Sequence, residues 1–119
     1  MAIQRFNTGK RLSEAVVHGN TVYLAGEVPD DKSKDIGGQT EEVLGKIERI
    51  LKQVGSDKSK LLSAQIFLTS MADFAGMNAV WEKWVVAGQT PARATIEAKL
   101  ANPAYKVEIM CIAALQEAP

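Results

Sequence analysis

The sequence predicts a two-layer α+β domain, with two helices on one face of a mixed sheet of about five or six strands. Two segments repeat apolar residues at helical spacing along a single stripe, so each helix has one face to bury. Several shorter segments are rich in β-branched residues and are bounded by glycine, asparagine or proline, as strands are. Placing both helices on one sheet face buries these surfaces together.

A β-hairpin and a loop are predicted first along the chain. The hairpin lies within Ala15–Ala25, where Gly19 and Asn20 separate two apolar, β-branched runs and tolerate the positive φ angles of a tight turn. The following segment, Gly26–Asp35, is polar, contains Pro29 and has no periodicity. We therefore expect an exposed loop there.

Both predicted helices are amphipathic. The first spans Ile36–Val54 and ends where Gly55 can adopt the left-handed conformation of a C-terminal cap. The second spans about Ala72–Ala87 and ends at Gly88. Their apolar stripes consist of Val43, Leu44, Ile47, Ile50, Leu51 and Val54 in the first helix, and of Phe74, Met77, Val80, Trp81, Trp84 and Val85 in the second.

Three further strands are expected, at Leu61–Thr69, at Ala92–Ala98 after Pro91, and at Tyr105–Leu115. The last strand is apolar on both sides, which favours a central position in the sheet. Because two helices cover only one face, the other apolar face needs a partner, and another copy of the chain would supply it. We therefore expect an oligomer. The two sides of this strand carry Val107, Ile109 and Cys111 on one, and Met110, Ile112 and Ala114 on the other.

Composition excludes several classes of function. The 119 residues suffice for one domain, residues 1–119, and 14 basic against 14 acidic residues give a formal net charge of zero. No charge excess is therefore available to bind nucleic acid or an anionic membrane. With one histidine, His18, and one cysteine, Cys111, neither an internal disulfide nor a four-ligand Cys/His zinc site can form. We expect His18 in an exposed turn and Cys111 in the core.

The apolar runs of the chain are all shorter than the roughly 20 residues of a membrane-spanning helix. The first residues also lack the apolar centre of a signal peptide. We therefore expect a cytoplasmic protein without a membrane partner. Any chemistry must come from arginine, carboxylates, hydroxyls, backbone groups and water.

Two charged residues, Arg93 and Glu108, lie within predicted strands, whereas most other charges lie on helix surfaces or in loops. If the last two strands formed an antiparallel hairpin centred on residues 100–101, Arg93 would face Glu108. One interpretation is a structural ion pair without catalytic meaning. The other is a site in which the guanidinium binds a carboxylate ligand bidentately while Glu108 handles a proton or orients water. Spacing alone does not decide between them.

Four segments of the chain carry a family resemblance. The C-terminal signature is PARATIEAKLANPAYKVEIMCIAA, and GNTVYLAG, QTEEVLGKIERILKQVG and DFAGMNAVWEKW extend the match upstream. Together these segments resemble the Rid family (YjgF, the reactive intermediate deaminases, also labelled endoribonuclease L-PSP) over nearly the whole chain. The runs RLSEAVVH and NPAYKVEI are most similar to the YoaB-like branch of that family.

The resemblance implies a chorismate-mutase-like α+β fold that assembles as a homotrimer with three ligand clefts between subunits. It also implies a reaction, the hydrolysis of enamine or imine intermediates such as 2-aminoacrylate to a 2-keto acid and ammonia. The substrate is then a small-molecule carboxylate. No cofactor or metal takes part in the implied reaction.

The resemblance also implies roles for single residues. Arg93 matches the arginine that clamps the substrate carboxylate, and Glu108 matches the glutamate that positions or activates the attacking water. Thr95 stands where the family has a cysteine whose backbone carbonyl contributes to the site. Further positions that line the cleft match Gly26, Phe74 and Asn78.

Leu12 departs from the family pattern, because the best-known deaminases carry a tyrosine there that closes over the substrate. Leucine keeps an apolar wall but removes the hydroxyl, so an alternative function stays open. In that alternative the protein is a non-catalytic or regulatory trimer that binds small carboxylates in the same cleft. The historical endoribonuclease label fits poorly with a zero net charge and no basic stripe.

Overall fold

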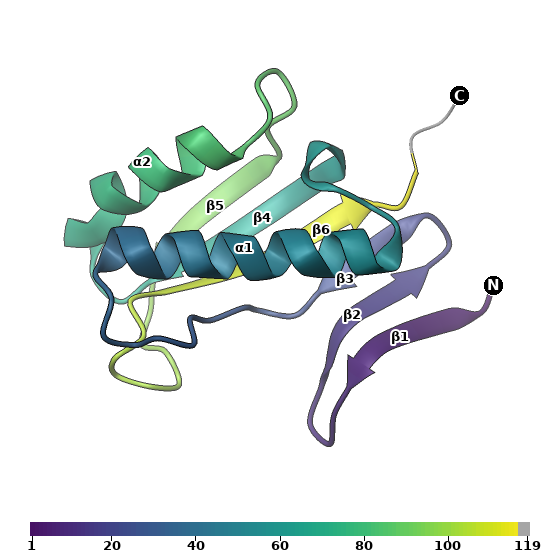
Figure 1. Cartoon of the computed structure of the whole chain (residues 1–119), viewed down its shortest axis with the longest axis horizontal. Coiled ribbons are helices and arrows are strands. Elements are labelled where there is room, and N and C mark those ends of the chain that lie inside the picture. Colours follow the sequence, from purple (N-terminus) through teal and green to yellow (C-terminus); the bar gives the residue numbers. More distant parts are fainter. Residues whose placement is uncertain (117–119) are drawn as a thin grey trace.

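The computed structural model describes residues 1–116, which form one six-stranded sheet and two α-helices (Figure 1). The loops contain two short 3₁₀ turns, Lys58–Lys60 and Met71–Asp73. In chain order the main elements are β1 (Ile3–Thr8), β2 (Ser13–His18), β3 (Thr21–Leu24), α1 (Ile36–Val54), β4 (Leu61–Leu68), α2 (Phe74–Trp84), β5 (Ala92–Glu97) and β6 (Val107–Ala114).

The last strand, β6, lies inside the sheet, whose strand order is β1-β2-β3-β6-β4-β5. It pairs antiparallel with both β3 and β4, whereas β5 pairs parallel with β4. The parallel pair requires a crossover, and α2 provides it. The predicted mixed sheet with the last strand in its centre is therefore confirmed.

Both helices lie on the same face of the sheet (Figure 1). Alternate residues of β6, from Val107 to Ala113, are buried in one core with the apolar stripes of the helices. The residues between them are only half-buried and point to the other side. We call this other side the open face; its apolar side chains include Tyr23, Phe67, Ile96, Met110 and Ile112. What covers the open face stays a prediction.

Helix α1 has the bounds that the sequence predicts, and both of its ends are capped. At the start, the Asp35 carboxylate accepts a hydrogen bond from the backbone N–H of Gly38 at 2.9 Å. At the end, Gly55 adopts φ 92° and its N–H bonds to the carbonyl of Lys52 at 3.1 Å. Within residues 1–116, no helix has both the length and the apolar character that crossing a membrane requires.

The last two strands do not pair, so the hairpin that would place Arg93 opposite Glu108 does not form. β4 lies between β5 and β6, so Arg93 is level with Ala64 of β4, and Glu108 is level with Phe67. The physical reason is burial: β6 is apolar on both faces and takes two strand neighbours, whereas the exposed β5 takes the sheet edge. The connection at residues 98–106 is long enough to carry the chain past β4.

Three smaller expectations also differ from the structure. The second helix is shorter than expected, because the 3₁₀ turn precedes it and it ends at Trp84. An additional edge strand, β1, pairs with β2, although its residues are mostly exposed and show no apolar period. The loop after β3 is not fully exposed, since Glu27 and Pro29 are buried. The conformations of this loop and of β1 depend on contacts with neighbouring strands, and their own sequence patterns do not predict them.

Candidate functional site

Arg93 is held against α2 by its own chain. Its side chain points to the helix-covered face, because β5 pairs in register with buried residues of β4. The Nη1 atom donates a hydrogen bond to Oδ1 of Asn78 at 2.7 Å. The guanidinium carbon also lies 5.9 Å from the ring centroid of Phe74 and 5.5 Å from that of Trp81. We call these four residues the arginine half-site.

The arginine half-site leaves hydrogen-bonding capacity free. A guanidinium has five N–H donors in a fixed fork, and Asn78 uses one of them. Arg93 is exposed and forms no ion pair with another residue of the part of the chain that the structure describes. Two aromatic rings and one amide thus fix the orientation of a cation that has no carboxylate partner among residues 1–116. Such a group can bind a carboxylate bidentately.

Glu108 lies on the open face, where it packs against Gly26. A Cβ atom built on Gly26 would overlap the Glu108 carboxylate, so this glycine leaves room for the Glu108 side chain in the conformation that it adopts. The contact is fixed by a bridge between neighbouring residues: the N–H of Glu27 bonds to the carbonyl of Ile109 at 2.9 Å, and the reverse bond is 3.1 Å long. We call Gly26 and Glu108 the glutamate half-site.

Within one chain, the two half-sites lie on opposite faces of the sheet. Arg93 is on the helix-covered face at the sheet edge, and Glu108 is on the open face two strands away. The structure therefore brings together Arg93, Asn78 and Phe74, and separately Gly26 and Glu108. It does not bring Arg93 to Glu108 within one chain.

Thr95 and Leu12 belong to neither set of contacts. Thr95 follows Arg93 by two residues on β5 and so points to the same face. Its hydroxyl oxygen is buried and has no hydrogen-bond partner within residues 1–116. Leu12 lies in the loop between β1 and β2 and is 58% exposed.

A buried carboxyl group, that of Glu27, lies next to the glutamate half-site, since Glu27 follows Gly26 and pairs with Ile109. Glu27 is only 6% exposed and lies opposite the buried Ile109. Burial is the main cause that raises the pKa of Glu27 from 4.5 to about 7; the carboxylate of Glu14 also raises it, and Lys46 opposes the rise. The ammonium of Lys46 is held by the carbonyl of Val28 at 2.8 Å and by Asp30 at 2.7 Å.

Sequence patterns missed two of these residues. Glu27 was expected in an exposed loop, and its only sequence signal is that it follows Gly26, the glycine just after β3. Trp81 was expected to pack in the core; it is buried, but its ring also lies against Arg93.

The expected exposure of His18 and the expected burial of Cys111 are confirmed. Burial raises the pKa of the Cys111 thiol to about 12. Among residues 1–116, no group of three or more His, Cys, Asp or Glu is placed to hold a metal ion.

Comparison with known proteins identifies the family. A family model described as Endoribonuclease L-PSP matches residues 2–115. The RutC family protein YoaB of Escherichia coli K12 is 46% identical over 115 residues, which cover 97% of this chain and all of that protein. The chloroplastic Reactive Intermediate Deaminase A of Arabidopsis thaliana is 35% identical over 109 residues, covering 87% of this chain and 58% of that protein.

Solved structures agree with this assignment. The crystal structure of a YjgF family member from Neisseria meningitidis superimposes with a TM-score of 0.96 at 46% identity, covering 99% of this chain and 98% of that one. The fold, with six mixed strands and two helices on one face, is the chorismate-mutase-like fold of these proteins. The chain therefore belongs to the Rid (YjgF, endoribonuclease L-PSP) family, and its likeness to YoaB assigns it to the YoaB-like branch.

Proposed function

We propose that this protein hydrolyses enamine or imine intermediates derived from amino acids, such as 2-aminoacrylate, to 2-keto acids and ammonia. The observation that carries the proposal is Arg93, a cation oriented by Asn78, Phe74 and Trp81 and without a carboxylate partner in the part of the chain that the structure describes. The substrate carboxylate is the natural ligand for such a fork of donors. A family relative named Reactive Intermediate Deaminase A supports the reaction class.

The proposed reaction uses water and one carboxylate. The enamine first takes up a proton from solvent at its methylene carbon and becomes an iminium ion. Water then adds to the iminium carbon: a C–O bond forms, the π electrons move to nitrogen, and Glu108 accepts a proton from the water. Glu108 returns this proton to nitrogen, the C–N bond breaks with its electrons leaving on ammonia, and the hydroxyl group loses its proton to solvent as the carbonyl of the 2-keto acid forms. No cofactor or metal is part of this proposal.

The two half-sites can serve one reaction only if they come from different subunits. One chain holds Arg93 and Glu108 on opposite faces, so we propose that the arginine half-site of one subunit meets the glutamate half-site of the next. The apolar side chains of the open face, Tyr23 and Ile112 among them, favour such an assembly. A closed ring of three copies gives three equivalent clefts. The Thr95 hydroxyl, which has no hydrogen-bond partner within the described residues, fits a site that is incomplete within one chain.

Leu12 supports a second candidate, a trimer that binds small carboxylates without turning them over. The best-known deaminases of the family carry a tyrosine at this position, whose hydroxyl leucine cannot replace. We expect Leu12 to leave the Arg93 clamp intact and to affect the choice of substrate. Under the second candidate, Arg93 binds 2-keto acids but no imine is consumed. Neither candidate assigns a nucleic-acid or membrane partner.

The decisive experiment generates 2-aminoacrylate in situ with a pyridoxal-phosphate-dependent enzyme and follows the formation of 2-keto acid. We expect the wild-type protein to accelerate it, and Arg93→Ala to raise KM and lower kcat, because both binding and positioning are lost. Arg5→Ala, an exposed arginine of β1, is the matched control and should behave as the wild type. Saturable, Arg93-dependent binding of a 2-keto acid without turnover would instead establish the second candidate. RNA cleavage that survives Arg93→Ala in highly purified protein would be needed to support the endoribonuclease label.

A further inference from the structure

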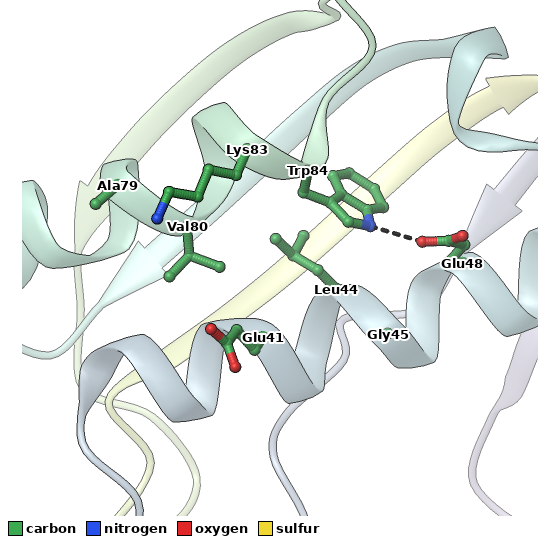
Figure 2. Close-up of a pocket in the computed structure, with 8 residues that line it drawn as sticks. All are labelled: Glu41, Leu44, Gly45, Glu48, Ala79, Val80, Lys83 and Trp84. Atoms are coloured by element: carbon green, nitrogen blue, oxygen red, sulfur yellow. Dashed lines mark hydrogen bonds between the residues drawn. The ribbon is translucent and has the colours of Figure 1, made fainter.

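We propose that the groove between α1 and α2 binds a free α-amino acid with a large apolar side chain. The proposal goes beyond the proposed hydrolysis and does not depend on it. The groove has a volume of about 410 Å³, within the usual range of ligand pockets. All of its lining residues belong to α1 and α2, which lie on the face of the sheet opposite the open face (Figures 1 and 2). Its lining residues are Glu41, Leu44, Gly45, Glu48, Ala79, Val80, Lys83 and Trp84.

A glycine in the middle of α1, Gly45, lines the groove. Gly45 does not have a positive φ, so its backbone does not require glycine. A Cβ atom built there would meet only Nη1 of Arg49, at an ordinary 3.6 Å, so packing does not require glycine either. Gly76 of α2 differs, since a Cβ there would lie 2.7 Å from Cγ2 of Ile36. Glycine is a poor helix former, and the absence of a side chain at Gly45 leaves space on this side of α1.

The floor and one end of the groove are apolar. Leu44 and Val80 form the floor, and the indole of Trp84 closes one end (Figure 2). The indole is fixed in place, because its Nε1–H donates a hydrogen bond to Glu48 at 2.9 Å. The ammonium of Lys58 lies 5.4 Å from the centre of the same ring. This end therefore offers a rigid apolar wall whose polar atom is already satisfied.

The other end of the groove carries one free charge of each sign. The carboxylate of Glu41 projects from α1, and the side chain of Lys83 runs away from Trp84 toward Ala79 (Figure 2). Neither residue takes part in an ion pair within the described chain. Two opposite, unpaired charges beside an apolar floor are complementary to a zwitterion with an apolar tail. The amino acid's ammonium would face Glu41, its carboxylate would face Lys83, and its side chain would extend toward Trp84.

The test is a titration of the ¹⁵N-labelled protein with L-leucine or L-phenylalanine, followed at the Gly45 amide and the Trp84 indole N–H. We expect saturable shifts at both signals. 4-Methylpentanoate lacks the ammonium and 3-methylbutylamine lacks the carboxylate, so each should bind at least about tenfold more weakly. Glycine, which lacks the side chain, should produce no saturable shift.

Substitutions in the groove test whether the amino acid binds there. Gly45→Leu fills the groove without removing a charge and should abolish the shift at Trp84 while the protein stays folded. Glu41→Gln and Lys83→Gln should each weaken binding about tenfold. Glu82→Gln, on the exposed side of α2, is the matched control and should bind as the wild type does.

Three results would overturn the proposal. One is no saturable shift with either amino acid at millimolar concentration. Another is binding that survives Gly45→Leu but is lost in Arg93→Ala, since the ligand would then occupy the arginine half-site. The third is a concentration-dependent shift of the same signals without any ligand, which would make the groove a contact between copies of the chain.

Discussion

The two faces of the sheet hold their functional residues in different ways. On the helix-covered face, Arg93 is fixed by three side chains of its own chain. On the open face, Glu108 has only the space left by Gly26 and takes part in no ion pair within residues 1–116. One chain therefore fully orients Arg93, the proposed carboxylate-binding group. It only partly fixes Glu108, the proposed proton carrier. The difference suggests that assembly, rather than folding, completes the site.

The largest expected effect follows from charging the open face. Ile112→Asp places a carboxylate opposite Tyr23, where assembly would bury it at a cost of several kcal/mol. If the protein is a trimer, light scattering should show the mass fall from about three times 12.9 kDa to one chain. Activity should disappear with it, while circular dichroism stays unchanged. Ala75→Asp, on the exposed side of α2, serves as the control. An unchanged mass would contradict assembly through the open face.

The second-largest effect is expected from replacing Glu108, the proposed proton carrier. Glu108→Gln keeps the size of the side chain and its contact with Gly26, but it cannot accept a proton from water. We expect kcat to fall about 10²–10⁴-fold with KM nearly unchanged, as is typical for loss of general acid–base catalysis. Steady-state kinetics on the in situ imine assay measure both constants. A rise in KM with unchanged kcat would assign Glu108 to binding and remove the proposed difference between the two faces.

The sequence identified Arg93 and Glu108 as candidate site residues, but it did not predict their positions relative to each other in the fold. The span of α1 was predictable because a regular apolar stripe ends at Gly55, and the central position of β6 because both of its sides are apolar. The relation of Arg93 to Glu108 was not predictable, since residue arithmetic assumes that consecutive strands pair. Only the parallel register of β5 on β4 assigns Arg93 to the helix-covered face.

Glu27 and β1 show the second limit of sequence patterns. The buried position of Glu27 depends on its bridge to Ile109, which lies far away along the chain. A polar segment containing a proline resembles an exposed loop whether or not a distant strand pairs with it. Strand β1 likewise lacks an apolar period, because its residues are mostly exposed and β2 alone fixes it.

The pH dependence of the free energy of unfolding should distinguish the residue next to the glutamate half-site, Glu27, from the residues that hold Arg93. Glu27, behind the glutamate half-site, has a pKa raised to about 7, so the folded state binds a proton that the unfolded state has lost above about pH 4.5. This contribution is fully present below pH 4.5 and is lost as the pH rises through 7. Glu27→Gln, which stays neutral, should remove that loss, worth up to about 3 kcal/mol. No comparable change is expected from Asn78 or Trp81, which do not titrate.

Denaturant unfolding between pH 5 and pH 8 measures this effect as the free energy of unfolding. The wild type should lose more stability over this interval than Glu27→Gln does. Glu14→Gln should give an intermediate slope, because it removes the carboxylate that helps to raise the pKa of Glu27. The exposed Glu82→Gln should keep the wild-type slope. Equal slopes for the wild type and Glu27→Gln would mean that Glu27 is ionised in the folded protein throughout.

The smallest expected effect concerns how firmly Arg93 is held. Trp81→Leu removes one ring beneath the guanidinium, a contact worth about 0.5–1 kcal/mol, so KM should rise about two- to fivefold. Because Trp81 is also buried, lost stability alone would lower the amount of folded enzyme and thus the apparent kcat. Trp81→Phe, which keeps an aromatic face, should restore KM even where stability remains reduced. If both variants leave KM unchanged, Asn78 and Phe74 are sufficient to orient Arg93, and the helix-covered face prepares its cation with two contacts instead of three.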